Sequence, residues 1–204
     1  MLPSYLVETI SVVSDAFVAL SALAVAIIGF IGLRQWREEL TGKAKFEVAR
    51  KIVTLSFQFR DEFGRARSPL TFGGEAAERP KFGGETEEET QLLDECFARK
   101  KRLEPLQESM RKLREASWEA EIVLSEDVGK LLQPFEHAFI ELWSAIEAYF
   151  STQLKRAKSG QRNSQLDDGL KSQQAIIYGI DDKPSRAVDA SVTALLRKLK
   201  AYVK

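Results

Sequence analysis

Apolar residues divide the chain into one long uncharged segment and several stretches with helical periodicity. The uncharged segment covers residues 16–33 within "AFVALSALAVAIIGFIGLRQWREEL", which runs from Ala16 to Leu40. The hydrocarbon core of a bilayer is about 30 Å thick and takes roughly 20 apolar residues in a helix. A soluble domain of this size seldom needs a helix that is apolar on every face. The pattern therefore predicts a transmembrane helix over residues 16–35 rather than the central helix of a soluble domain.

The flanks of this segment argue against a cleaved export signal and predict its orientation. Residues 1–15 contain no Lys or Arg but include Glu8 and Asp15, and no small-residue cleavage site follows the segment. Six basic residues lie between 34 and 51, and basic residues concentrate on the cytoplasmic side of a membrane. We therefore expect residues 1–15 to be a short extracytoplasmic N-terminus and the rest to be cytoplasmic, at the inner membrane. Three residues are expected at the membrane interface: Arg34, Trp36 and Arg37.

Small residues follow one face of the predicted span. With Ser11 at its start, this face carries Asp15, Ala19, Ala22, Ala26 and Gly29 at spacings of four or three residues. Small residues let helices approach closely in lipid, so the face is a candidate helix–helix contact; the alternative is that alanine is simply common in spans. Asp15 either lies among the headgroups or, if the span sits deeper, meets a polar partner.

Two segments follow the span. Residues 36–66 are predicted to form a juxtamembrane helix with apolar residues on two faces, either continuous with the span or restarting after Thr41-Gly42. Residues 67–86 are rich in Gly and Pro and are predicted to be a loop. "FGGE" occurs twice in it, which makes Phe72 and Phe82 a possible partner-binding pair. The alternative is two turns of a linker.

Residues 87–157 are predicted to form an antiparallel pair of long helices. The first has a stripe that alternates at four and three residues, typical of a coiled-coil-like seam, with Arg99 and Ser117 as its weak points. The positions of the stripe are Leu92, Cys96, Arg99, Leu103, Leu106, Met110, Leu113, Ser117, Ala120 and Leu124. Pro105 should kink this helix or begin a new one. The second, starting near Ser125, has a similar stripe at Val128, Leu132, Phe135, Phe139, Leu142, Ile146 and Tyr149.

The C-terminal part is predicted to contain a linker and a last helix. Residues 158–184 are polar and turn-rich, apart from "AIIYGI" at 175–180, which suggests a lone strand or a buried plug. Residues 185–204 have an amphipathic pattern. The expected fold is all-α: an N-terminal transmembrane helix followed by an antiparallel three- or four-helix cytoplasmic bundle with coiled-coil-like seams.

The amino-acid composition limits the kinds of partner and site that the chain can have. Among 204 residues the 30 basic and 30 acidic side chains balance, which argues against a nucleic-acid partner. There is one cysteine, Cys96, and one histidine, His137, too few for a disulfide framework or a Cys/His zinc site. We therefore expect no cofactor, no metal, no catalytic set and no small-molecule substrate. Three local basic runs are interpreted as solvated helix faces, or as contacts with an anionic leaflet: 99–102, 155–158 and 197–204.

Three stretches together carry a resemblance to a family: "WREELTGKAKFEVARKIV", "FRDEFGRARSP" and "IIYGIDDKPSRAVDASVTALL". They are similar to a group of bacterial hypothetical membrane proteins with one N-terminal transmembrane helix and a helical cytoplasmic domain. The resemblance implies a bacterial inner-membrane protein and carries no catalytic residue over to this chain.

These observations favour a non-enzymatic, membrane-anchored helical interaction or scaffold protein. Its expected partners are the lipid bilayer and either a protein partner or further copies of the chain. The alternative is an oligomerising membrane effector or signalling subunit. An enzyme is the least favoured class, because no polar side chains cluster in the predicted helices.

Overall fold

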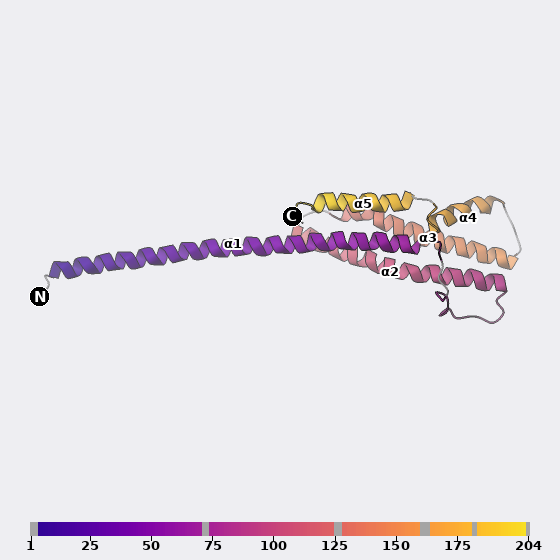
Figure 1. The fold of residues 1–204 in the computed structure, drawn as a ribbon, viewed down its shortest axis with the longest axis horizontal. Coiled ribbons are helices and arrows are strands. Elements are labelled where there is room, and N and C mark those ends of the chain that lie inside the picture. The colour runs from indigo at the N-terminus through magenta and orange to yellow at the C-terminus, as the bar shows by residue number, and fades with distance from the viewer. Residues whose placement is uncertain (1–3, 71–73, 125–127, 160–163, 181–182, 203–204) are drawn as a thin grey trace. The chain divides into compact units, whose positions relative to one another are not determined.

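The computed structural model describes residues 4–70, 74–124, 128–159, 164–180 and 183–202, without the side chains of 4–16, 19 and 164–166. Within these residues the chain is all-helical and contains no strand, which confirms the predicted fold class at that level. Five helices follow in order: α1 Ser4–Ala66, α2 Glu87–Leu124, α3 Gly129–Ser159, α4 Ser164–Ile177 and α5 Lys183–Leu199 (Figure 1). The chain divides into two compact units, Met1–Lys45 and Phe46–Lys204.

Helix α1 runs without a break through Thr41 and Gly42, so the span and the juxtamembrane segment belong to one helix. A glycine inside a helix costs only about 1 kcal/mol relative to alanine, which its neighbours can offset. One neighbouring contact is the hydrogen bond that Thr41 Oγ1 donates to the Arg37 carbonyl at 2.9 Å. Of the two alternatives for this region, the structure has the continuous helix.

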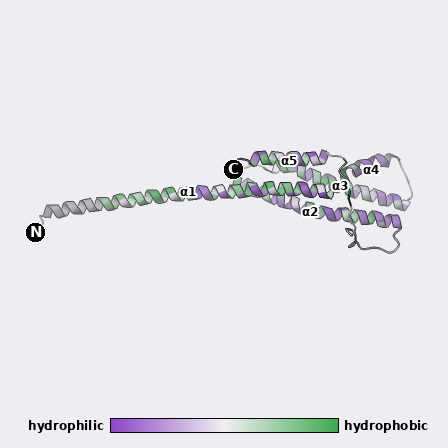
Figure 2. Cartoon of the chain, viewed as in Figure 1, coloured by the Kyte–Doolittle hydropathy of each residue, from purple (hydrophilic) through white to green (hydrophobic). Residues whose placement is uncertain are grey.

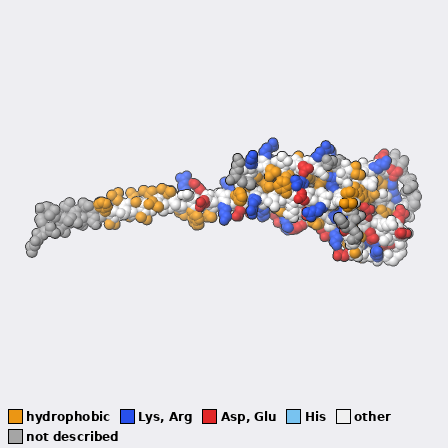
Figure 3. All heavy atoms as spheres, viewed as in Figure 1, with side chains coloured by type: hydrophobic (Ala, Val, Ile, Leu, Met, Phe, Trp, Pro, Cys, Tyr) orange, Lys and Arg blue, Asp and Glu red, His pale blue; other side chains and the backbone are white. Residues whose placement is uncertain are grey.

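The described side chains of α1 that precede Arg34 form a mostly apolar surface. Every described side chain between residues 17 and 44 is exposed. In the part of the chain that the structure describes, one helix, near the N-terminus, is long and apolar enough to cross a membrane. Hydrophobic colouring and hydrophobic side chains dominate the first described turns of α1, and charged side chains follow them (Figures 2 and 3). A continuous apolar surface of this kind costs free energy in water, so it needs a cover of lipid or protein.

The second unit is built on one hydrophobic core. Buried residues of α2, α3, α4, α5 and the last turns of α1 form a single cluster. Helix α3 packs against α2, α4 and α5, and Phe59 of α1 meets Phe135 of α3 edge to face with ring centroids 5.2 Å apart. The predicted stripe of α2 is buried from Arg99 to Leu124. These helices are therefore stabilised mainly by what their apolar faces bury together.

Helix α2 begins at a capping box that sequence reasoning overlooked. The Thr86 hydroxyl accepts a hydrogen bond from the Glu89 amide at 3.2 Å, and the Glu89 carboxylate accepts one from the Thr86 amide at 2.9 Å. Together they satisfy two backbone donors that a helix start leaves unpaired. The helix then continues through Pro105, so the expectation of a new helix after Glu104 is wrong. Buried Leu103 and Leu106 on either side of the proline help offset its cost of about 3 kcal/mol.

The segment predicted as a linker contains helix α4. The "AIIYGI" stretch is not a strand: its first three residues end α4, and Gly179 follows with a φ of 70°. Glycine adopts this left-handed conformation without a steric penalty and commonly ends helices. Ile177 is fully buried and Ile180 is exposed, so only part of the stretch packs in the hydrophobic core. The sequence of α4 is mostly polar and does not indicate a helix by itself. Packing against α3 stabilises the helix.

Candidate protein-interaction site

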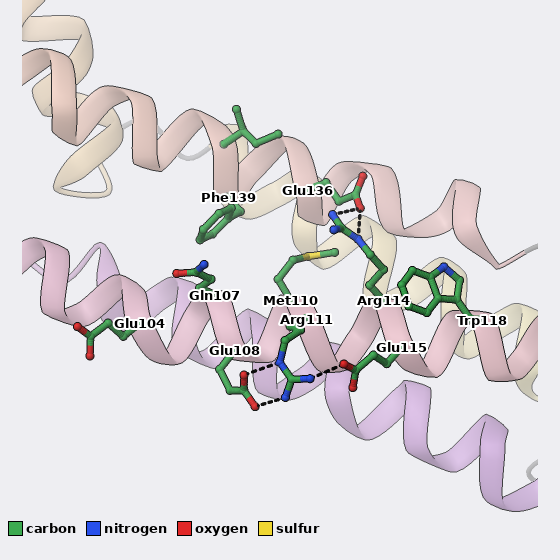
Figure 4. A pocket seen from close by; sticks show the side chains of 11 residues that line it. Glu104, Gln107, Glu108, Met110, Arg111, Arg114, Glu115, Trp118, Glu136 and Phe139 are labelled. Atoms are coloured by element: carbon green, nitrogen blue, oxygen red, sulfur yellow. Dashed lines mark hydrogen bonds and ion pairs between the residues drawn. The ribbon is translucent and has the colours of Figure 1, made fainter.

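An open groove of about 540 Å³ lies along the outer surface of α2 and α3. Its lining includes Met110, Arg111, Arg114 and Trp118 from α2 and Phe139 and Ile140 from α3; we call this surface the α2–α3 groove (Figure 4). Two ion pairs between the helices show that α2 and α3 run in opposite directions. Lys100 pairs with Glu147 at 2.6 Å, and Arg114, further along α2, pairs with Glu136, which comes earlier on α3, at 2.7 Å. A groove between two helices has the shape that an amphipathic helix fills.

Large apolar side chains are exposed in and beside this groove. Trp118 is 58% exposed and Ile140 57%, and the adjoining Ile122 and Trp143 are 82% and 40% exposed. Trp143 also contacts Phe139, with ring centroids 6.1 Å apart. Several large apolar side chains exposed along one groove mark an interaction surface more often than scattered apolar residues do. The groove is therefore the best candidate interaction site in the described part of unit 2.

Charged side chains border the groove and pair with one another. Arg111 pairs with Glu108 at 2.7 Å and also with Glu115. Its hydrogen bonds lower the pKa of Glu108 from the ordinary 4.5 to about 2. Arg114 and Glu136 form an ion pair that crosses the groove from α2 to α3. Exposed pairs of this kind stabilise a fold little, but they can orient a partner.

Sequence reasoning missed most of this surface. Trp143 does not belong to the stripe predicted for the second long helix. Trp118 and Ile122 lie outside the four-three stripe of α2, four residues apart, and so form a second apolar strip on the same helix. An apolar pair on a helix face that the main stripe does not occupy was the signal that could have revealed it.

A second hollow, of about 300 Å³, involves one of the two predicted partner-binding phenylalanines. Phe82 is 72% exposed and lines the hollow with Gly84, Leu93 and Leu154, among others. Phe72 lies outside the described residues. The structure therefore leaves the predicted pairing of the two phenylalanines untested.

The loop that carries Phe82 is held by a nearly buried arginine. Arg79 forms two hydrogen bonds to Glu85, at 3.0 and 2.8 Å, and one to Asp94 at 2.5 Å. A planar guanidinium matches a carboxylate in this two-bond arrangement. The hydrogen bonds from Arg79 lower the pKa of Glu85 from 4.5 to about 2. These contacts tie residues 79–85 to the start of α2.

We expect the contribution of Glu85 to stability to disappear in acid. Because its pKa is lower in the folded state, the ionised pair stabilises fully above the unfolded pKa of about 4.5. The contribution then falls as the pH drops toward 2. Glu85→Gln should lower the urea midpoint of unit 2 at pH 7, and its difference from the wild type should shrink between pH 4.5 and 2. A difference that stays constant over this range would contradict the role of the Arg79–Glu85 pair.

Three further arginines hold the C-terminal end of α1. Arg99 is fully buried and donates a hydrogen bond to the Ser68 carbonyl at 2.6 Å. The central carbon of its guanidinium lies over the Tyr178 ring, 4.5 Å from the ring centroid. Arg102 donates to the same carbonyl at 3.0 Å, and Arg67 donates to the Ile176 carbonyl at 2.8 Å. Cationic donors suit the carbonyls left unpaired at a helix end. The interpretation of residues 99–102 as a solvated basic face is therefore wrong for Arg99 and Arg102.

The single cysteine and histidine form no reactive cluster in the described structure. Cys96 is half-buried, and burial raises the pKa of its thiol, which lowers its reactivity. His137 is exposed on α3. Among the described residues, no group of three or more His, Cys, Asp or Glu side chains is placed to hold a metal ion.

The residues predicted to act in the membrane all belong to the first unit. Ala22, Ala26 and Gly29 are exposed on α1, whereas the side chains of Asp15 and Ala19 lie outside the description. Arg34 pairs with Glu38 at 3.0 Å, and Trp36 and Arg37 are exposed. Helix–helix contact and membrane-interface roles at these positions stay predictions.

Comparison with protein-family models, with curated proteins and with solved structures gave no match.

Proposed function

We propose that this protein is a non-enzymatic scaffold that a single N-terminal helix anchors in the bacterial inner membrane. The observation that carries the proposal is the α2–α3 groove, with exposed Trp118 and Ile140, on a unit whose core includes the end of the apolar helix α1. A chain with an uncovered apolar helix and a separate aromatic groove has two surfaces that need different covers. Lipid suits the first, and protein suits the second.

In this proposal unit 2 is an antiparallel helical bundle with coiled-coil-like seams. The opposed directions of α2 and α3 and the regular burial along α2 support this arrangement. Such a bundle presents rigid side chains at fixed spacing, because each helix is held by its neighbours. A rigid groove of this kind loses little conformational entropy when a partner helix binds.

The proposed orientation places residues 1–15 outside the cell membrane and unit 2 in the cytoplasm. Basic residues after the span, from Arg34 to Lys51, support it. The orientation matters for function, because it decides which partners the α2–α3 groove can reach.

Cysteine accessibility tests both the anchor and its orientation. In a Cys96→Ser background, Ser172→Cys introduces a thiol at an exposed position of α4, and Ser4→Cys introduces one at the N-terminus. We expect a membrane-impermeant maleimide to label Ser4→Cys in intact spheroplasts and Ser172→Cys only after lysis. The Cys96→Ser parent should stay unlabelled and serves as the control. Labelling of Ser172→Cys in intact spheroplasts, or recovery of the chain in the soluble fraction, would overturn the proposal.

A further inference from the structure

We propose that the α2–α3 groove is a self-association surface, in which the α2–α3 pair of one copy packs on that of a second copy. The inference deepens the proposed function, because it names the partner of the groove. It rests on the positions of the exposed apolar side chains, on the charges between them and on the way two copies can match them.

The apolar side chains form two clusters on either side of the Arg114–Glu136 ion pair. Trp118 and Ile122 follow Arg114 on α2, and Ile140 and Trp143 follow Glu136 on α3. Because the two helices run in opposite directions, these clusters lie toward opposite ends of the groove. In Figure 4 Phe139 lies on one side of the Arg114–Glu136 ion pair and Trp118 on the other.

A two-fold axis parallel to the helices places this pattern of one copy against the same pattern of a second copy. Helix α2 of one copy then lies over α3 of the other, so the two Trp118–Ile122 clusters meet at one end and the two Ile140–Trp143 clusters at the other. The same operation places Arg114 of each copy opposite Glu136 of the second copy. An interface of this type uses the same patch twice, as closed dimers do.

Charge selects this arrangement over its alternative. A two-fold axis perpendicular to the helices, in the plane of the contact, would bring Arg114 against Arg114 and Glu136 against Glu136. Like charges brought together in an interface disfavour that arrangement. In the parallel arrangement each arginine gains a second carboxylate, so the crossing ion pair inside one chain is repeated between chains.

The parallel arrangement also suits two anchored chains. Both copies then have residue 46, where unit 2 begins, at the same end of the four helices. Two chains held in one membrane need this common direction. This step of the argument rests on the proposed membrane anchor, whereas the matching of clusters and charges does not.

Co-purification of two differently tagged full-length copies tests the interface. We expect the wild-type copies to co-purify from detergent-solubilised membranes, and Trp118→Lys with Ile140→Lys to reduce recovery of the second copy by about tenfold or more. Leu70→Lys with Ile180→Lys adds the same charge at two exposed apolar positions outside the groove and should leave recovery unchanged. Failure of wild-type copies to co-purify, or equal recovery from all three pairs, would overturn the proposal.

A charge exchange makes the test specific for the groove. Arg114→Glu places two carboxylates at the crossing point, and Glu136→Arg places two guanidinium groups there. Each variant should therefore fail to associate with itself, whereas a mixture of the two should associate as the wild type does. Recovery of the mixture also shows that both variants fold. A mixture that stays monomeric while the wild type associates would exclude the proposed contact. The accessibility of Ser172→Cys is measured independently of co-purification. If the copies do not associate, the proposed membrane anchor is unaffected, and if the anchor proves wrong, the association through the groove can still be interpreted.

Discussion

Replacing Phe135 with alanine should lower the free energy of unfolding of unit 2 by about 3–5 kcal/mol, the usual cost of removing a buried phenylalanine side chain. Phe135 is fully buried and joins α3 to α1 through its edge-to-face contact with Phe59. Alanine would remove the ring from both helices and leave a cavity that rigid neighbours can only partly fill. Because a domain is stable by only about 5–15 kcal/mol, this loss is a large part of the total.

The measurement is urea unfolding of the full chain in detergent, followed by tryptophan emission. In a Trp36→Phe background both remaining tryptophans, Trp118 and Trp143, lie in unit 2 and report its unfolding alone. Phe82→Ala is the matched control, because it removes the same ring from a side chain that is 72% exposed. Its effect should stay within about 0.5 kcal/mol. A Phe135→Ala effect as small as that of the control would show that the ring does not hold α1 to α3.

Two lysines in the middle of the apolar segment should abolish membrane integration. A basic residue at the centre of a membrane helix costs about 2.5–3.5 kcal/mol on insertion scales. Val25→Lys with Ile28→Lys should therefore move most of the chain out of the membrane fraction after alkaline carbonate extraction. Both residues are exposed on α1, so the change leaves the core of unit 2 untouched. The expected loss follows from desolvation of the charges and not from misfolding.

The control for this experiment keeps the number of charges and changes their place. Leu70→Lys with Ile180→Lys adds two lysines at exposed positions of unit 2 and should leave the membrane fraction unchanged. Val25→Leu with Ile28→Leu keeps the segment apolar and should behave as the wild type does. If the double-lysine chain stays in the membrane as the wild type does, residues 16–35 are not the anchor.

Helices with strong local patterns were predictable from the sequence. The stripe of α2 from Leu103 to Leu124 and that of α3 from Leu132 to Tyr149 repeat at helical spacing, and the structure buries most of both. A helix is stabilised by bonds within one segment of chain, so its periodicity is visible without knowledge of the fold. The apolar length of α1 was visible for the same reason.

Helix α4 and the arginines around α1 were not predictable in this way. Residues 164–177 are mostly polar, and their helix depends on contacts with α3, including the Arg156–Asp167 ion pair at 2.9 Å. Arg99 looked like a weak point in an apolar stripe, yet it is buried because the end of α1 supplies carbonyl acceptors for it. Acceptors that lie about 30 residues away in sequence leave no trace in the local pattern.

The sequence by itself determined the helical class and the one apolar segment of span length, because periodicity, charge and length are properties of neighbouring residues. Only the tertiary structure decided which apolar residues stay uncovered. Trp118 and Leu113 are both large apolar residues of α2, but Leu113 is fully buried and Trp118 is more than half exposed. That difference depends on which face of α2 the other helices of unit 2 cover, and the face left uncovered beside α3 forms the α2–α3 groove.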